Sequence, residues 1–228
     1  MTTIVVLPDM HFPHVDLPRL TQVEEDMRGL SPSHIVQIGD LGDWYRTSNF
    51  DKDPRRVDTL NDERIQVCNW LAKLRRQHPD ARIDICEGNH EDRMRRYLWS
   101  KANALASLPE LTVPAMYGLN GLGIGYHGRS GFKQYGVRFK HGDAVRSKAG
   151  YTATAEMEAH RCSGVSGHTH RFNSARRTDK EGVTTEWWEI GHLSDISKVE
   201  YTSSPDWQPG YMVIYASPDG VEFNPIYL

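Results

Sequence analysis

The chain has 228 residues, of which 38% are hydrophobic and 25% charged, and a formal net charge of −3 at pH 7. This length suffices for one substantial core, so we expect a single domain over residues 1–228. The slight negative charge argues against a protein that coats nucleic acid or an anionic membrane by bulk charge. No apolar run approaches the ~20 residues of a membrane helix. The N-terminus shows no signal-peptide pattern, so we expect no membrane partner.

The cysteines indicate a reducing compartment. Cys68, Cys86 and Cys162 are odd in number and widely spaced, which does not fit a disulfide framework or a thiolate zinc site. We therefore expect reduced thiols in a cytoplasmic protein, with Cys68 and Cys86 packed in the core.

The first half of the chain alternates strand and helix patterns. Buried strands are predicted over residues 3–9, 34–40 and 81–89, and helices over residues 16–30, 60–77 and 91–105. The residues expected to face inward are Leu17, Leu20, Val23 and Met27 in the first helix, and Ile65, Cys68, Leu71 and Leu74 in the second. This alternation needs crossover connections and predicts a parallel sheet covered by helices.

The second half is rich in short strand patterns. They cover residues 136–143, 162–170, 184–191, 210–216 and 221–228, interrupted by one predicted helix at about 149–161. The last two strands form a hairpin through Asp219 and Gly220. We therefore predict an α/β fold in which two sheets pack as a β-sandwich with helices outside, in four layers (α/β/β/α).

Polar clusters follow five of the predicted strands. They are "LPDMH" with Asp9 and His11, "IGDLGD" with Asp40 and Asp43, "EGNHE" with Asn89 and His90, "KHGD" with His141, and "SGHTH" with His168 and His170. Because the carboxyl ends of strands in an open α/β sheet line one crevice, we expect these clusters to meet. Residues two apart on a strand point the same way, so each D-x-H or H-x-H pair is expected to converge on one ion.

The pooled side chains have the chemistry of a metal site. Imidazole, carboxylate and one carboxamide, without thiolate, suit divalent ions such as Mn²⁺, Fe²⁺ or Zn²⁺. More ligands are present than one ion needs, so the economical arrangement is two ions ~4 Å apart that share a carboxylate. Such a pair supports in-line displacement at phosphorus.

The series D-x-H, G-D-x-x-D, G-N-H-E, H and G-H-x-H runs in this order from Asp9 to His170 and resembles the calcineurin-like metallophosphoesterase superfamily. The resemblance implies a helix-flanked β-sandwich, a two-metal site with Mn²⁺ expected and Fe²⁺, Zn²⁺ or Ni²⁺ compatible, and hydrolysis of phosphate esters by a metal-bridging hydroxide. Asp40 would bridge the ions. The implied ligands are Asp9, His11, Asp40 and His170 for the first ion, and Asp40, Asn89, His141 and His168 for the second.

The same resemblance gives His90 a catalytic place beside the leaving-group oxygen, as general acid or as a stabiliser of developing charge. Asp43, Glu91 or Asp92 could hold the His90 ring cationic, and Asp43 is favoured. His127 competes with His141 as a ligand, but the stronger strand pattern precedes His141. The other histidines at element boundaries, His34, His78 and His160, are expected at the surface.

Three further residues are candidates for substrate binding. Arg93 and Arg171 adjoin the motifs and could clamp a phosphate. Trp44 could stack on a base or cover the core, and it stands where the Ser/Thr protein phosphatase branch is expected to have Arg, which disfavours that branch. Little chain remains after His170 for a capping domain, so we expect an open site.

The open site favours a phosphodiesterase acting on nucleotides or nucleic acid. The alternatives are a phosphomonoesterase acting on nucleotides or proteins, and a catalytically silent metal-bound scaffold.

Overall fold

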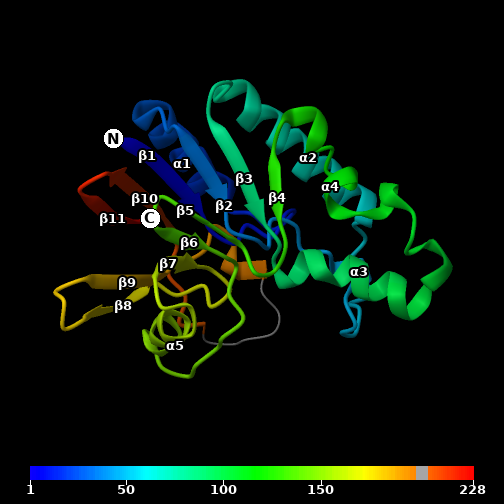
Figure 1. Ribbon diagram of the computed structural model, residues 1–228. Helices are drawn as coiled ribbons and strands as arrows, with labels where there is room; N and C mark the ends of the chain where they lie inside the picture. The colour runs from blue at the N-terminus through cyan, green and yellow to red at the C-terminus, as the bar shows by residue number, and fades with distance from the viewer. Residues whose placement is uncertain (199–204) are drawn as a thin grey trace.

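The computed structural model describes residues 1–198 and 205–228, and two β-sheets pack face to face in it with helices on both outer sides (Figure 1). The strands are β1 (Thr2–Leu7), β2 (His34–Gln37), β3 (Arg82–Cys86), β4 (Gly125–His127), β5 (Phe132–Gln134), β6 (Val137–Phe139), β7 (Ser163–Ser166), β8 (Asn173–Thr178), β9 (Thr184–Glu189), β10 (Gly210–Ser217) and β11 (Gly220–Tyr227). The α-helices are α1 (Leu17–Leu30), α2 (Leu60–Gln77), α3 (Asn89–Lys101), α4 (Val113–Met116) and α5 (Tyr151–His160). Short 3₁₀ helices are η1 (Tyr45–Thr47), η2 (Asn103–Leu105), η3 (Pro109–Leu111), η4 (Asn120–Leu122) and η5 (Ile196–Lys198).

The strand order is β11-β10-β1-β2-β3-β4 in the first sheet and β5-β6-β7-β9-β8 in the second. In the first sheet β1 to β4 run parallel, and β10 pairs antiparallel with β1, Ile4 opposite Ile214. In the second sheet β6, β7 and β9 run parallel; α5 is the crossover between β6 and β7, and β8, antiparallel to β9, lies in the connection from β7 to β9. The predicted two-sheet α/β class is confirmed, but the sheets do not divide at the middle of the chain. The C-terminal hairpin joins the sheet formed by the N-terminal strands.

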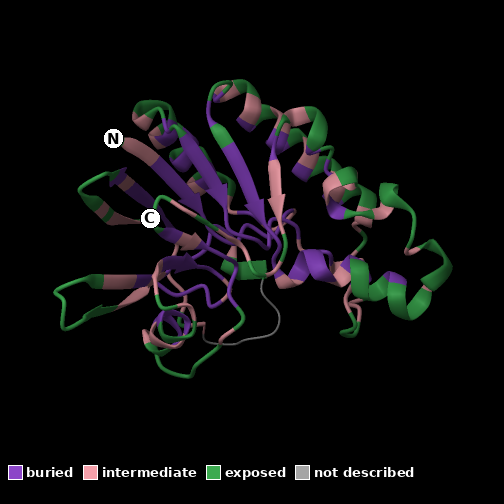
Figure 2. Ribbon diagram, in the orientation of Figure 1, coloured by how far each residue is buried: buried purple, intermediate pink, exposed green. Residues whose placement is uncertain are grey.

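Three apolar clusters fill the spaces between the layers, and the strands of the first sheet are buried along their length (Figure 2). One cluster joins α1 and α2 to the outer face of the first sheet, and includes Val23 and Leu71. The second lies between the sheets, where Val6 and Val36 of the first meet Val165 of the second. The third packs α5 against Trp187. The layers are therefore helix, sheet, sheet, helix.

The inward faces of the helices differ in part from the sequence prediction. Leu17 at the start of α1 is 64% exposed, because it precedes the first full turn over the sheet. Ile65 of α2 is 42% exposed, since Val67 and Trp70 carry the buried stripe instead. Within the described residues, no helix combines the length and apolar character that crossing a membrane requires.

Two of the three histidines predicted at the surface, His34 and His78, are buried, which is a second correction. His34 is fully buried, and its Nε2 lies 2.7 Å from a carboxylate oxygen of Asp84. His78 is also buried, and His160 stacks on Trp187 with ring centroids 5.4 Å apart. His34 and His160 each contact an acidic or aromatic side chain of another element, which an element boundary in the sequence does not reveal.

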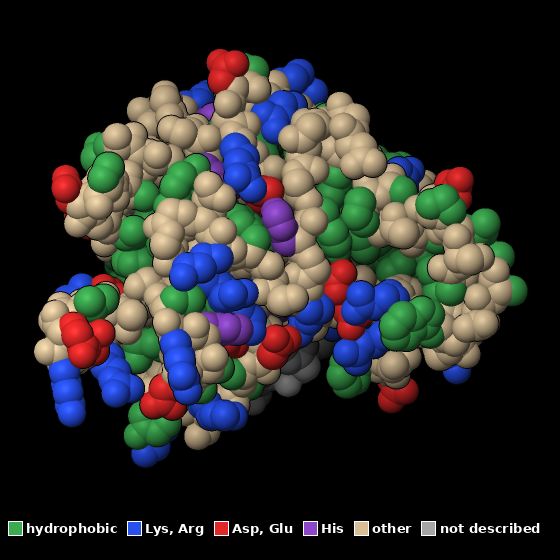
Figure 3. Space-filling view, in the orientation of Figure 1, with side chains coloured by type: hydrophobic (Ala, Val, Ile, Leu, Met, Phe, Trp, Pro, Cys, Tyr) green, Lys and Arg blue, Asp and Glu red, His purple; other side chains and the backbone are tan. Residues whose placement is uncertain are grey.

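Apolar side chains are exposed on the segment that follows the first turns of α3. On the face shown in Figure 3, hydrophobic side chains gather over this part of the molecule, and Trp99 and Leu105 are 61% and 46% exposed. The segment lies outside the layers of the sandwich (Figure 1).

A buried carboxyl group of α2 anchors the loop after β2. Glu63 is 3% exposed, and its Oε1 accepts a hydrogen bond from the Trp44 backbone N–H at 2.7 Å. Burial raises the pKa of Glu63 to about 8; the hydrogen bond from Trp44 opposes the shift, and the nearby Asp43 charge adds to it. Glu63 is therefore a neutral acid in the folded protein below that pH.

We predict that Glu63→Gln changes the pH dependence of stability. An unfolded Glu loses its proton near pH 4.3, whereas Glu63 keeps it to about pH 8, so stability falls as pH rises through this window. The neutral Gln side chain removes that contribution. Between pH 5 and pH 8 the melting temperature of the wild type should fall by about 4 °C or more relative to the variant, measured by calorimetry. The exposed Glu110→Gln should show no such difference, and a constant offset for Glu63→Gln would contradict the assignment.

Candidate metal centre

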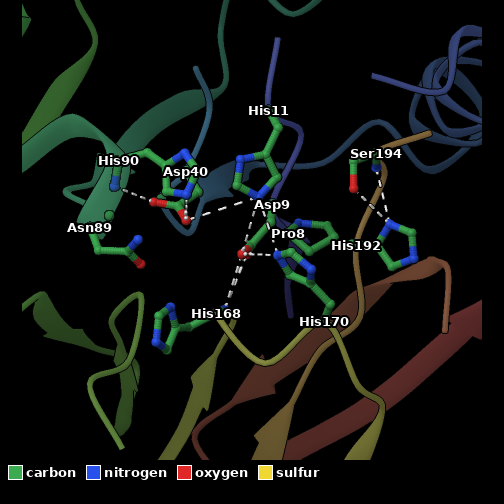
Figure 4. A network of polar contacts seen from close by, with 12 residues as sticks. Pro8, Asp9, His11, Asp40, Asn89, His90, His168, His170, His192 and Ser194 are labelled. Carbon is green, nitrogen blue, oxygen red and sulfur yellow. Dashed lines mark hydrogen bonds and ion pairs between the residues drawn. The ribbon is translucent and has the colours of Figure 1, made fainter. Parts of the chain in front are cut away.

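The loops after five strands meet at the carboxyl edge of the two sheets, as predicted (Figure 4). The loop after β1 supplies Asp9 and His11, the loop after β2 supplies Asp40, the start of α3 supplies Asn89 and His90, the loop after β6 supplies His141, and the loop after β7 supplies His168 and His170. The sequence therefore identified the side chains that converge here. Their role as metal ligands stays a prediction.

The first group of ligand atoms comes from Asp9, His11 and His170, all buried. His170 Nε2 lies 2.9 Å from Asp9 Oδ2 and 3.2 Å from His11 Nε2. Two imidazole nitrogens that face each other this closely beside a carboxylate point their lone pairs at one place. Such an arrangement has the donor atoms that a divalent ion needs.

The second group comes from Asp40, His141 and His168, with Asn89 beside them. His141 Nε2 lies 3.3 Å from Asp40 Oδ2, 3.2 Å from His168 Nδ1 and 2.9 Å from Asn89 Oδ1. Asp40 Oδ2 is also 4.0 Å from His11 Nε2 of the first group. Asp40 thus stands between the two groups, where a shared ligand belongs.

The pKa shifts of Asp9, Asp40 and His141 favour two ionised carboxylates and one protonated histidine in the centre. Burial alone would raise the pKa values of the Asp9 and Asp40 carboxyls, but neighbouring histidines outweigh it and lower both, Asp40 well below its ordinary value. Burial lowers the pKa of His11 to about 3 and that of His168 to about 4. Burial also opposes protonation of His141, yet Asp40 and Asp9 raise its pKa to about 9. One proton on His141 is a poor substitute for divalent charge between two carboxylates.

Glycines leave the room that the ligand atoms occupy. A Cβ on Gly88 would lie 2.1 Å from Asp40 Oδ1, and one on Gly167 would lie 2.3 Å from Asp9 Oδ1. A Cβ on Gly39, which has φ +110°, would lie 2.8 Å from His141 Nδ1. Close packing of backbone beneath the carboxylates, together with the donor set, fits a pair of divalent ions.

The predicted residues do converge, but the D-x-H and H-x-H pairs do not lie on strands as predicted. β1 ends at Leu7 and β7 at Ser166, so neither D-x-H nor H-x-H lies on a strand. His11, His168 and His170 have φ of 50°, 69° and 59°, in the left-handed region that non-glycine residues rarely adopt. Turns of this kind send His168 and His170 to different groups instead of one.

His90 lies at the side of the centre, between an acid and an arginine. Its Nδ1 lies 2.8 Å from the Asp43 carbonyl oxygen and 3.2 Å from the Asp43 carboxylate, so Nδ1 carries the proton. Its Nε2 accepts from an Arg93 guanidinium nitrogen at 2.8 Å and lies 3.7 Å from Asp40 Oδ2. Burial opposes ionisation of Asp43, but the hydrogen bond and charge of His90 lower its pKa below the ordinary range.

Of the three candidate partners of His90, the structure places Asp43 against the ring. Glu91 instead accepts hydrogen bonds from the backbone N–H groups of Asp40, Leu41 and Gly88, each at 2.9 Å. Glu91 therefore joins the Asp40 loop to the start of α3. Asp92 pairs with Arg95 and Arg96 on the far side of the helix.

The three predicted substrate-binding residues differ in their outcome. Arg93 lines the pocket and contacts His90. Arg171 also lines it, but its guanidinium donates to the Arg146 and Ser147 carbonyl oxygens. Trp44 is a correction: it is 1% exposed and packs on Tyr117, because Glu63 turns the loop backbone at Trp44 toward α2. Its predicted stacking on substrate is wrong.

His127 lies outside the centre, where it binds Asp84 at 2.7 Å and stacks on Phe132. His141 is thus the histidine that reaches the ligand cluster. His14 borders the pocket, and His192 packs behind His170 with ring centroids 5.5 Å apart.

A cavity of about 1360 Å³ opens over the centre. Beyond the motif residues and Tyr45, which follows the Asp40 motif in the sequence, its lining includes the side chains Phe50, Arg55, Arg56, Arg146 and Trp207, for which the sequence led to no prediction. Arg56 pairs with Asp43 at 2.7 Å and so reaches the carboxylate that faces His90. These residues lie in loops without a spacing pattern, so the sequence carried no signal for them.

The fold of the chain is shared with proteins of known structure. The chain is similar in structure to a dimetal phosphatase from Danio rerio, with TM-score 0.53, 12% sequence identity, and coverage of 99% of this chain and 96% of that chain. This likeness shows the fold, and the chain has the calcineurin-like metallophosphoesterase fold that the motifs predicted. Vps29 from Chaetomium thermophilum also matches, with TM-score 0.45, 13% identity, and 99% and 94% coverage.

Sequence relatives come from bacteriophages. Proteins called gene 54 protein in Mycobacterium phages D29 and L5 are 27% and 26% identical to the chain over 231 and 244 residues. The matches cover 91% and 97% of this chain, and 86% and 91% of the phage proteins. No family model matches the chain.

We predict that Asp40→Ala releases both ions. Asp40 lies between the two groups, so its loss removes an oxygen ligand from each and leaves histidines that repel one another when charged. The metal content of Mn²⁺-loaded protein, measured by elemental analysis after desalting, should fall from two ions per chain in the wild type to near zero in the variant. The exposed Asp80→Ala is the matched control. Two retained ions in Asp40→Ala would contradict the bridging role.

Proposed function

We propose that the chain is a two-metal phosphoesterase, and specifically a phosphodiesterase that acts on nucleotides or nucleic acid. The observation that carries the proposal is the pair of ligand groups that meet at Asp40, with His90 held at their side. Mn²⁺ is the ion we propose first, and Fe²⁺, Zn²⁺ and Ni²⁺ also suit the donor set. The cytoplasmic location predicted from the thiols belongs to the same proposal; Cys68, Cys86 and Cys162 are free.

The ions, when bound, supply charge that polarises the phosphate and lowers the pKa of water at the centre. The chain supplies the geometry. Asp9, Asp40 and the four ligand histidines are fixed by buried loops, so little reorganisation accompanies reaction. Asn89 completes the second group with a neutral oxygen.

His90 is the proposed general acid. Asp43 holds the ring through Nδ1, which aims Nε2 at the centre. Arg93 now donates to that nitrogen, so a phosphate that draws the guanidinium away frees Nε2 to take a proton from solvent water and deliver it to the leaving oxygen. Arg93 thereby couples phosphate binding to the state of the acid.

The open cavity supports a diester as substrate. Its lining continues past His90 to the loop of residues 48–58 and past His170 to Trp207, so groups on both sides of a phosphate find space. A phosphomonoester has only one such group, and a closed site suits it better.

The deciding experiment compares hydrolysis of bis-p-nitrophenyl phosphate with that of p-nitrophenyl phosphate in the presence of Mn²⁺. We expect the diester to have the higher kcat/KM, and activity to disappear with a chelator and return with the metal. A preference for the monoester would identify a phosphomonoesterase. Activity on neither substrate would favour a metal-bound scaffold.

We predict that His90→Ala lowers kcat for the diester by about 10²- to 10⁴-fold, the usual scale for one acid–base group. The metal content should stay at two, because His90 is not needed in either group of three. His11, Asp40 and His90 also come close enough to hold an ion together, so metal analysis accompanies the kinetics. A lost ion in His90→Ala would make His90 a ligand.

A further inference from the structure

The loop of residues 48–58, here called the pocket loop, borders the cavity on the side of His90. Arg56 lies at its centre, bound to Asp43 at 2.7 Å and to Asp58 at 3.0 Å, with its guanidinium 3.9 Å from the Tyr45 ring centroid. Since Asp43 also holds His90, the pocket loop lies directly beside the proposed general acid. In the proposed reaction this is the side of the leaving group.

The backbone of the pocket loop is tied down, so the position of its side chains is defined. Lys52 Nζ donates to the Ser48 and Phe50 carbonyl oxygens at 2.6 and 2.8 Å. The Phe50 N–H donates to Ser48 Oγ at 3.1 Å, and the Asp53 N–H donates to the Tyr45 hydroxyl. These bonds hold Phe50 at the mouth of the cavity.

Phe50 is 77% exposed and lines the cavity. A single exposed apolar side chain is ordinary on a protein surface. Phe50 differs because a fixed loop presents its ring beside a phosphate-cleaving centre, while the neighbouring Tyr45 ring is already covered by Arg56 and by Lys52 at 4.9 Å. The Phe50 ring is an open face on which a flat group can stack.

On the side of His170 and Arg171, the cavity is lined by residues 145–147, in the segment before α5. Arg146 lies there, exposed and lining the cavity. Its carbonyl oxygen accepts from Arg171, which fixes the backbone at this point. Its guanidinium has no hydrogen bond or ion pair within residues 1–198 and 205–228, so it is available for a phosphate.

We propose that the cavity binds a single-stranded segment of nucleic acid across the metal centre, with the base on the leaving-group side stacked on Phe50 and a phosphate on the other side bound by Arg146. The substrate is single-stranded because a base can stack on a side chain only when it has left a duplex. An aromatic ring and a cation on opposite sides of the centre match the two recurring groups of a nucleotide chain. This inference rests on the proposed phosphodiesterase function and names its substrate.

The test measures binding of fluorescent 12-nucleotide strands by anisotropy, in Mn²⁺ and in a His90→Asn background that limits cleavage. Phe50→Ala and Phe50→Leu should weaken binding by roughly 5- to 150-fold, the scale of one base–aromatic stack. Phe50→Trp should restore wild-type affinity, because it keeps the ring. An abasic strand of equal charge should bind the Phe50→Ala variant and the parent protein with the same affinity.

Arg146→Ala should give the complementary pattern. It should weaken ordinary and abasic strands equally and reduce the slope of log affinity against log salt by about 1, as loss of one phosphate contact requires. Trp99→Ala is the matched control, since Trp99 is an exposed aromatic residue outside the cavity lining. It should bind every strand like the parent.

Several results would overturn the inference: full affinity in Phe50→Ala, full rescue by Phe50→Leu, an equal loss on the abasic strand, or tighter binding of a duplex than of its single strands. Hydrolysis of bis-p-nitrophenyl phosphate by the wild type is measured in parallel. If the small diester is cleaved but no strand binds, the inference fails and the phosphodiesterase stands. If strands bind with the predicted Phe50 dependence and no diester is cleaved, the proposed hydrolysis fails and the binding site stands.

Discussion

Two buried carboxylates at the edge of the first sheet impose the main constraint on this structure. Asp9 and Asp40 are 0% and 2% exposed, and an uncompensated charge in such a place is costly. Imidazoles from three loops surround them, yet burial lowers the pKa values of His11 and His168 and so disfavours their charged forms. The proposed pair of divalent cations would meet this constraint, and the fold brings both carboxylates to one point.

Backbone contacts convert that constraint into fixed geometry. The Met10 and His11 N–H groups both donate to the Asp40 carbonyl oxygen at 3.0 Å, which locks the first two loops together. Glu91 binds the backbone around Asp40 from α3, and Glu189 accepts from Thr169, the residue between His168 and His170, at 2.8 Å. Acidic side chains outside the two ligand groups thus set the positions of the candidate ligands.

The sequence predicted which residues form the centre better than it predicted the backbone conformations and contacts that position them. The alternation of strands and helices predicted a crevice at the carboxyl ends of the strands. The order of the motifs identified the candidate residues from Asp9 to His170. Periodicity could not show that His11 and His168 lie in left-handed turns, because tertiary contacts impose those conformations. Trp44 illustrates the same limit: its side chain is placed by Glu63, nineteen residues further along, and no local pattern reports that pairing. Short strands such as β4 and β5, with three residues each, also fall below what alternation can detect.

The pairing of β1 with β10 affects how the first sheet folds during synthesis of the chain. Thr2 to Val6 are aligned with Ala216 to Met212, so the strand that leads to Asp9 gains its antiparallel neighbour only after more than two hundred further residues have been synthesised. Until then the first sheet has an open edge beside its earliest strand, and contacts of such long sequence separation form slowly. The nascent polypeptide therefore contains Asp9 and the other candidate ligands before β10 can complete the sheet beside them.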